Sequence, residues 1–156
     1  MDLTRHLRIT GGALKSWLIA QIIDSVVVGV LWLTGLHILK VPFAPLWAVL
    51  AMLLQLIPHL GPVLSMIGPV LSAAIFWADW EHPLYVLLLY GIIVALDGFL
   101  LQPFIMKRTA KVPIWASILA PLVLGIVIPF WGVLLAPPLL AVLYAYKARH
   151  ERASSH

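Results

Sequence analysis

Two long apolar runs without formal charge constrain the fold of this chain more than any other feature. Residues 41–78 (38 residues) and 112–146 (35 residues) contain no Asp, Glu, Lys or Arg. Apolar runs of roughly 18 or more residues are candidates for membrane-spanning helices. As single helices these two would be roughly 52–57 Å long, nearly twice the thickness of a hydrocarbon core of about 30 Å. Each run must therefore fold back on itself.

Each run carries a helix-breaking motif near its middle. The motifs are Ile57-Pro58-His59-Leu60-Gly61-Pro62 and Ile128-Pro129-Phe130-Trp131-Gly132. Proline lacks an amide donor and clashes with the preceding turn, while glycine adopts the φ values that a chain reversal needs. We expect two hairpins, residues 43–78 and 114–146, with arms of roughly 14–16 residues, or roughly 21–24 Å. Such arms either barely span the bilayer or form re-entrant hairpins that stop short.

Two further apolar stretches are long enough to span, residues 16–36 with the single charge Asp24 and residues 83–106 with the single charge Asp97. The chain is 63% apolar and 10% charged, whereas soluble domains average about 45–50% and about 25%. Because no signal-peptide cleavage site follows the first stretch, we expect a retained span. The sequence therefore predicts an all-α integral membrane protein with two long transmembrane helices, each followed by a Pro/Gly-broken helical hairpin.

The basic residues indicate a topology. With the amino terminus in the cytoplasm, nine of the ten Lys and Arg residues lie inside and only Lys40 lies outside, as short cytoplasmic loops require. Both termini are then cytoplasmic and the acidic turn 79–82 is external. The basic residues sit at segment ends without interleaved aromatics, so we expect no nucleic-acid partner. The expected organisation is a cytoplasmic basic amphipathic segment (1–15), a first membrane repeat (16–82), a second membrane repeat (83–146) and a cytoplasmic tail (147–156).

A sequence repeat links the two hairpins. Lys40-Val41-Pro42 and the following Ile57-Pro58-x-x-Gly61 recur as Lys111-Val112-Pro113 and Ile128-Pro129-x-x-Gly132, at an offset of 71 residues. Because the first hairpin begins outside and the second inside, the halves are expected to form an inverted-topology repeat. Inverted repeats with discontinuous helices are typical of secondary transporters. The alternative is a chance match in a chain rich in Pro and Leu.

The two intramembrane acids are the strongest candidates for function. Asp24 lies in the middle of the first span, with Gln21 and Ser25 within one turn of it. An ionised Asp at the bilayer centre costs about 2.5–3.5 kcal/mol, so it needs a partner, a proton or a water-filled path. Asp97 lies nearer the inner interface, where Lys107 and Arg108 could reach it. Either acid could bind a proton or cation, or could be a structural ion pair or a snorkelling side chain.

Two other polar residues leave similar alternatives. His59, in the first hairpin turn, could titrate near neutral pH or could satisfy a freed backbone carbonyl. Gln55 could hydrogen-bond to a polar ligand, although a hydrogen bond to a neighbouring helix is the simpler interpretation. The other histidines lack metal-ligand spacing, and the chain shows no Ser/His/Asp arrangement or phosphate loop. We therefore expect no metal, no cofactor and no enzymatic activity.

Three ordered motifs carry a family resemblance. Leu56-Ile57-Pro58-His59-Leu60-Gly61-Pro62, then Asp97-Gly98-x-x-Leu101-Gln102-Pro103, then Gly132-x-x-x-Ala136-x-Pro138-Leu139 resemble the motifs of the autoinducer-2 exporter family, also called PerM-like permeases. The resemblance covers roughly residues 11–146. Two positions depart from the family pattern, since His59 replaces an aromatic residue and Asp97 replaces Glu. Family members are about twice as long, so the chain resembles their carboxy-terminal half.

The resemblance implies export or exchange of a small solute across the bacterial cytoplasmic (inner) membrane by a multi-pass homo-oligomer, with or without other membrane subunits. Autoinducer-2 export and sodium/proton exchange are both attributed to the family. By this match, residues of the three motifs line or shape the path: Pro58, Gly61, Pro62, Asp97, Gly98, Gln102, Pro103 and Gly132.

The leading hypothesis is a secondary transporter of a small polar solute, with ion or proton coupling. The alternatives are a non-transporting accessory subunit of a larger membrane complex and one half of a split transporter. The expected partners are the lipid bilayer and a small polar solute or ion. The complete set of candidate path residues is Gln21, Asp24, Gln55, Pro58, His59, Gly61, Pro62, Asp97, Gly98, Gln102, Pro103, Pro129 and Gly132.

Overall fold

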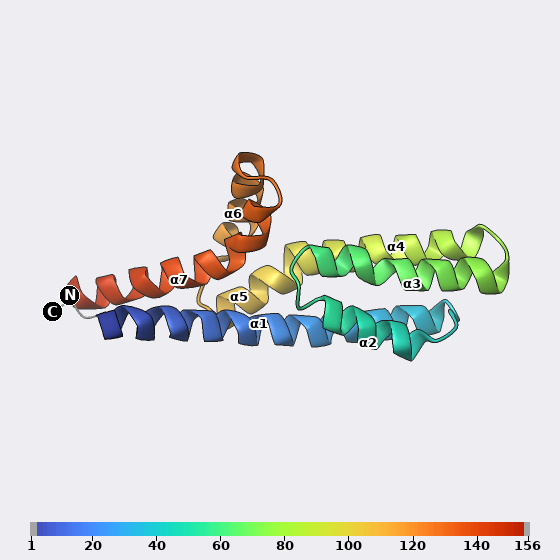
Figure 1. Ribbon diagram of the computed structural model, residues 1–156, viewed down its shortest axis with the longest axis horizontal. Coiled ribbons are helices and arrows are strands. Elements are labelled where there is room, and N and C mark those ends of the chain that lie inside the picture. Colours follow the sequence, from blue (N-terminus) through green and yellow to red (C-terminus); the bar gives the residue numbers. More distant parts are fainter. Residues whose placement is uncertain (1–2, 155–156) are drawn as a thin grey trace. The chain divides into compact units, whose positions relative to one another are not determined.

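The chain folds into helices joined by short turns (Figure 1). The computed structural model describes residues 3–154, and within that range there is no strand. The helices are α1 (Leu3–Ile38), α2 (Ala44–Leu54), α3 (Leu60–Trp77), α4 (Glu81–Leu96), α5 (Gln102–Thr109), α6 (Ile114–Val127) and α7 (Trp131–Ser154), with a π-helical turn at Asp97–Leu101 between α4 and α5. The all-α prediction is confirmed.

Four helical segments are long and apolar enough to cross a bilayer by length and composition. They are Leu3–Ile38, Leu60–Trp77, Glu81–Thr109 and Trp131–Ser154. Large apolar side chains lie on the outside of these helices, and Ile38 and Ile75 are among the most exposed. Because lipid tails are as apolar as these side chains, such surfaces are stable in a bilayer and not in water. The chain is an integral membrane protein.

The chain divides into two compact units, which we describe separately. The first-hairpin unit is residues 21–98, and the second-hairpin unit combines residues 3–20 with residues 99–154. In the first, α2 packs against α3 and α3 against α4; in the second, α6 packs against both α5 and α7. The units do not coincide with the expected repeats, 16–82 and 83–146, because α1 contributes to both units and α4 belongs with the first hairpin. The repeat boundaries stay a prediction.

The helices extend beyond the apolar stretches. The basic segment at the amino terminus is helical from Leu3, as part of α1, and α7 continues through Lys147 to Ser154. The outermost residues of the two expected cytoplasmic segments, 1–2 and 155–156, lie outside the described residues.

Both expected hairpins are present, but the expected arm length of roughly 14–16 residues holds only for α6, which has 14. The two arms of the first hairpin, α2 and α3, have 11 and 18 residues, and those of the second, α6 and α7, have 14 and 24. At about 1.5 Å per residue α2 is only about 16 Å long, too short to span. It ends at Leu54 because the Pro58 ring clashes with the carbonyl four residues earlier and Pro58 has no amide hydrogen.

The two hairpin turns share one backbone geometry. His59 and Phe130 both have positive φ, 64° and 66°. The next residue in each turn donates its amide to a proline carbonyl: Leu60 to Pro58 and Trp131 to Pro129, both at 2.8 Å. Lys40 and Lys111, which begin the repeated motif, also both have positive φ, 54° and 56°. The sequence repeat is therefore a repeat of local structure, while its inverted orientation stays a prediction.

Glycine is required in each turn because two segments of backbone meet there. A Cβ on Gly61 would overlap the Leu54 carbonyl oxygen and lie 2.8 Å from the Gln55 nitrogen. A Cβ on Gly132 would overlap the Leu124 carbonyl oxygen and lie 3.1 Å from the Gly125 nitrogen. No side chain fits at such distances, so these glycines set how closely the arms approach.

Candidate functional site

Four of the candidate polar residues meet in the first-hairpin unit. Gln21 and Asp24 come from α1, Gln55 directly follows α2, and Asp97 begins the π-helical turn after α4. All four are buried, with exposed fractions of 5%, 1%, 2% and 6% in that order. We call these four residues the carboxyl–amide cluster.

The Gln55 amide joins the two acids. Its Nε2 donates to Asp24 Oδ2 at 3.1 Å and to Asp97 Oδ2 at 2.8 Å. An amide nitrogen carries two hydrogens, so Gln55 uses both on carboxyl groups. One side chain thereby connects residues 31 and 42 positions away in the chain. The two acids are held within reach of each other by a neutral donor rather than by a cation.

Gln21 completes the cluster by binding the backbone of Gln55. Its Nε2 donates to the Gln55 carbonyl oxygen at 2.7 Å. Helices end with carbonyl groups that lack an intrahelical partner, and the break before Pro58 places such a carbonyl in the protein interior. The hairpin motif therefore frees a carbonyl group, and Gln21 on α1 satisfies it.

One oxygen of each carboxyl group is left without a partner. Asp24 Oδ1 and Asp97 Oδ1 are buried and, among the described residues, accept no hydrogen bond. Lys40, which is exposed, is the sole Lys or Arg of the first-hairpin unit, residues 21–98. A buried charge is costly unless it is paired. A proton or a small cation bound at the cluster would therefore give these two unpaired carboxyl oxygens a partner.

The π-helical turn between α4 and α5 begins at Asp97. Such turns insert an extra residue into a helix and frequently occur at functional sites. Asp97 is the first residue of this turn, Asp97–Leu101. Its hydrogen-bond partner is the Gln55 amide, so no ion pair with Lys107 or Arg108 is needed to hold it. The guanidinium of Arg108 instead lies 4.7 Å above the Phe104 ring.

The remaining candidates are not part of this cluster. Pro58, Gly61 and Pro62 shape the turn that follows Gln55, with Pro58 and Gly61 buried and His59 exposed. Gly98 follows Asp97 and is exposed. The other four belong to the second-hairpin unit: Gln102, Pro103, Pro129 and Gly132. Pro103 and Gly132 are buried and Pro129 is exposed.

Two sequence interpretations can now be refined. Gln55 was expected to bind a ligand or a neighbouring helix, and it binds side chains from two other helical segments at once. Ser25, a possible companion of Asp24, donates instead to the Ile22 carbonyl of its own helix at 2.8 Å. Within residues 3–154 no group of three or more His, Asp or Glu side chains is placed to hold a metal ion.

Buried acids within apolar helices that break at matched hairpins are the combination found in membrane transport proteins. The chain is identified more closely by comparison with known proteins. The model of the AI-2E transporter family matches residues 2–151, and the chain belongs to this family. The resemblance drawn from the three sequence motifs is confirmed.

The chain is similar in sequence to two proteins of Escherichia coli K12. It is 36% identical to "Putative transport protein YhhT" over 77 residues, which are 49% of this chain and 22% of that protein. It is 33% identical to "AI-2 transport protein TqsA" over 96 residues, which are 62% of this chain and 28% of that protein. The chain thus matches less than a third of the length of these relatives. No solved structure was found to match it.

Proposed function

We propose that this chain forms the ion-binding core of a secondary transporter for a small polar solute, with a proton as the coupling ion. The observation that carries the proposal is the carboxyl–amide cluster, whose two acids each keep one buried oxygen without a partner. The name of TqsA supports a solute of the autoinducer-2 class. The bacterial cytoplasmic membrane, cytoplasmic termini and a homo-oligomer are part of the same proposal.

The chemistry of the cluster favours a proton over a metal cation. Divalent cations such as Ca²⁺ and Mg²⁺ take about six or more oxygen ligands. The cluster offers two free carboxyl oxygens, and Gln55 turns its amide nitrogen, a donor, toward the two acids. A proton needs only one donor and one acceptor oxygen. In the loaded state one acid carries the proton and donates it to a neighbouring acceptor, and the cluster bears a single negative charge. Loss of the proton leaves two buried charges, which favours a conformation that admits water to the cluster.

The hairpin supplies the part that changes. Gln55 lies at the end of a short arm, directly before the Pro58 turn, and holds both acids. A shift of α2 therefore moves the shared donor away from both carboxyl groups together. This couples occupancy of the acids to the position of the hairpin, as alternating access requires.

The test is proton-driven flux in proteoliposomes that contain the full chain. A pH gradient is imposed, and internal pH and uptake of autoinducer-2 are recorded. Asp24→Asn and Asp97→Asn are expected to reduce coupled flux by about tenfold or more, because each removes an intramembrane acid. The matched control is Asp79→Asn, the same change at an acid in the turn between α3 and α4, which should leave flux within about twofold of the parent.

Two results would reject the proposal. Equal loss of flux in all three variants would show that the cluster acids have no special role. Absence of flux in the parent chain, together with its co-purification in fixed ratio with other membrane chains, would favour an accessory subunit or half of a split transporter. The short match to the relatives' lengths makes that second function a specific alternative.

A further inference from the structure

The second-hairpin unit contains nearly all the basic residues of the protein. Among its described residues, 3–20 and 99–154, nine are Lys or Arg and the sole acid is Glu151. The first-hairpin unit has one Lys and no Arg. An excess of this size attracts anions to one part of the molecule. The question is whether any of these cations are gathered into a binding site.

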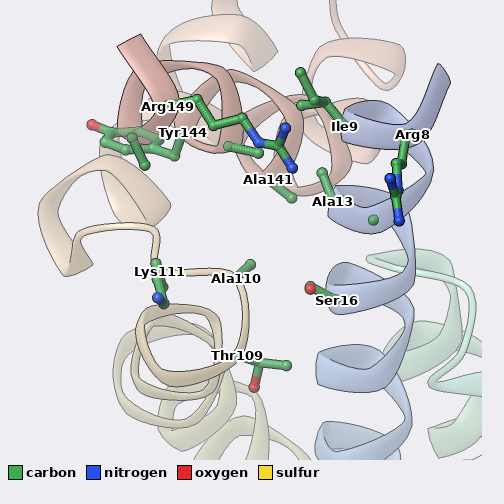
Figure 2. Close-up of a pocket in the computed structure, with 13 residues that line it drawn as sticks. Arg8, Ile9, Ala13, Ser16, Thr109, Ala110, Lys111, Ala141, Tyr144 and Arg149 are labelled. Carbon is green, nitrogen blue, oxygen red and sulfur yellow. The ribbon is translucent and has the colours of Figure 1, made fainter. Parts of the chain in front are cut away.

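Three of them line one pocket of about 220 Å³ (Figure 2). Arg8 comes from α1, Lys111 from the connection between α5 and α6, and Arg149 from α7. Ser16 and Thr109, which carry hydroxyl groups, also line it, and among residues 3–154 no Asp or Glu does. Figure 2 shows Arg149 reaching from its helix toward the α1 side of the pocket. The polar groups of this pocket are all suited to an anion.

The remaining walls of the pocket are mostly small residues, together with Ile9 and the Tyr144 ring. Ile9 and Ala13 of α1 and Ala141 and Ala145 of α7 contribute to them. Ile9, Ala13 and Ala141 are buried, so the floor is fixed by packing against the unit's own core. The pocket therefore combines a cationic rim with an apolar floor, which suits an amphiphilic anion better than a fully hydrated one.

A hydroxyl group fastens the two helices beside the pocket. The Tyr146 hydroxyl on α7 lies 3.1 Å from His6 Nδ1 and 3.3 Å from Thr10 Oγ1 on α1. The His6 and Tyr146 rings also stack, with centroids 5.8 Å apart. A second hollow of about 380 Å³ shares Ile9 and Arg149 with this pocket. Arg8 and Arg149 thus sit on helices that are already joined, so binding does not have to bring these two helices together.

We propose that this pocket binds the phosphate group of an anionic phospholipid, with the acyl chains along the apolar faces of α1 and α7. Guanidinium groups match phosphate oxygens in a bidentate fork, and the Lys ammonium adds a point charge. Basic pockets between transmembrane helices are where acidic lipid headgroups bind. The pocket is also smaller than the roughly 300–1,000 Å³ typical of sites for drug-sized ligands. A headgroup fits, with the rest of the lipid in the bilayer.

This site is independent of the carboxyl–amide cluster, and its test needs no transport. The full chain is purified in a nonionic detergent and titrated with short-chain phosphatidylglycerol, short-chain phosphatidylcholine and inorganic phosphate, with affinity read by microscale thermophoresis. Arg8→Gln, Lys111→Gln and Arg149→Gln are combined in one variant. The control combines Lys15→Gln, Lys107→Gln and Arg108→Gln, which remove the same charge outside the pocket.

Phosphatidylglycerol is expected to bind the parent tightly and the pocket variant about a hundredfold more weakly, since each basic residue near an anionic headgroup contributes roughly a factor of five. The control variant should bind within about threefold of the parent. If the combined pocket variant does not fold, as judged by helical circular dichroism, Arg149→Gln alone should weaken binding about fivefold.

Three results would overturn the proposal. Equal weakening in the pocket and control variants would indicate attraction by net charge only. Equal affinity for phosphatidylcholine and phosphatidylglycerol would remove the role of the anionic headgroup. Inorganic phosphate binding as tightly as phosphatidylglycerol would identify a site for soluble anions instead of lipid.

Discussion

Replacing Gly61 by Ala tests the hairpin geometry most directly. A Cβ there would overlap the Leu54 carbonyl oxygen, lie 2.5 Å from the Leu54 carbonyl carbon and lie 2.8 Å from the Gln55 nitrogen. All three atoms belong to the backbone, so no side chain can rotate away. The clash can be relieved only by moving the end of α2 away from the start of α3.

The size of the effect follows from these distances. Carbon atoms in ordinary contact lie about 3.5–4.0 Å apart, so the two segments must separate by roughly 1 Å or more. Overpacking costs about 1–3 kcal/mol when side chains can adjust, and a backbone obstacle places the cost at the upper end, about 3 kcal/mol. The higher helix propensity of Ala relative to Gly offsets up to about 1 kcal/mol of this loss. A net loss of about 2 kcal/mol or more in the free energy of unfolding is expected.

The movement also reaches the candidate site. The backbone nitrogen of Gln55 is one of the atoms that the added Cβ would approach, and the Gln55 side chain donates to both buried acids. Displacing its backbone by roughly 1 Å lengthens hydrogen bonds that now measure 2.8 and 3.1 Å. Transport should therefore fall together with stability, although the substituted residue carries no chemistry of its own.

The assay is unfolding by increasing SDS in mixed micelles, followed by circular dichroism. Gly132→Ala should behave like Gly61→Ala, because its Cβ meets the Leu124 carbonyl in the same way. Gly91→Ala is the matched control, since nothing lies within 4 Å of its added Cβ, and it should be neutral or stabilising by up to about 1 kcal/mol. Equal stability of Gly61→Ala and Gly91→Ala would refute the close approach of the arms.

Three further predictions concern other contacts. Gln55→Leu removes the donor to both buried carboxyl groups and should lower the free energy of unfolding by about 2–4 kcal/mol. Gln102→Leu, the same change outside the cluster, should have less than half that effect. Equal effects of the two substitutions would contradict the hydrogen bonds of the carboxyl–amide cluster. The backbone N–H of His82 donates to Asp79 Oδ1 at 3.0 Å and, with the His82 side chain, holds the pKa of Asp79 below its usual value. Because the folded pKa is the lower one, protection of the His82 amide from hydrogen exchange should be full above about pH 4 and decline as the pH falls further; protection unchanged at the most acid pH would contradict this. Tyr146→Phe removes a hydroxyl that contacts α1 and should lower the free energy of unfolding by about 1 kcal/mol. The measurement is the same SDS unfolding, with Tyr85→Phe as the control. No difference between the two variants would show that the Tyr146 hydroxyl does not hold α1 and α7 together.

The breaks in the helices could be predicted because they depend on local chemistry. Pro58 and Pro129 each stand in the same motif with a glycine three residues later, and this motif located both breaks, whereas Pro69 and Pro121 lie inside helices that continue. The unequal lengths of the arms were missed because the equal division took no account of the residues before Pro58 that leave the helix. The π-helical turn was also missed, since Gly98 gave no signal that distinguishes it from an ordinary helical residue.

The candidate site was predicted only in part, because local sequence chemistry identifies single residues but not how they pack together. Asp24 and Asp97 are conspicuous as lone charges in apolar stretches, so sequence reasoning singled out both. Their meeting through Gln55 depends on packing between segments 31 and 42 residues apart, which no local pattern contains. The pocket cations were treated as topology signals, because Arg8, Lys111 and Arg149 come together only through the packing of three separate segments.

The shortness of α2 also bears on how the protein is made. An arm of 11 apolar residues is well below the roughly 17–25 that a nascent chain needs to be retained in the bilayer as one span. It therefore has no stable place in the membrane until the 18 residues of α3 have left the ribosome and can insert with it. We therefore expect the two arms to insert as a pair, with the turn at Pro58 forming during biosynthesis.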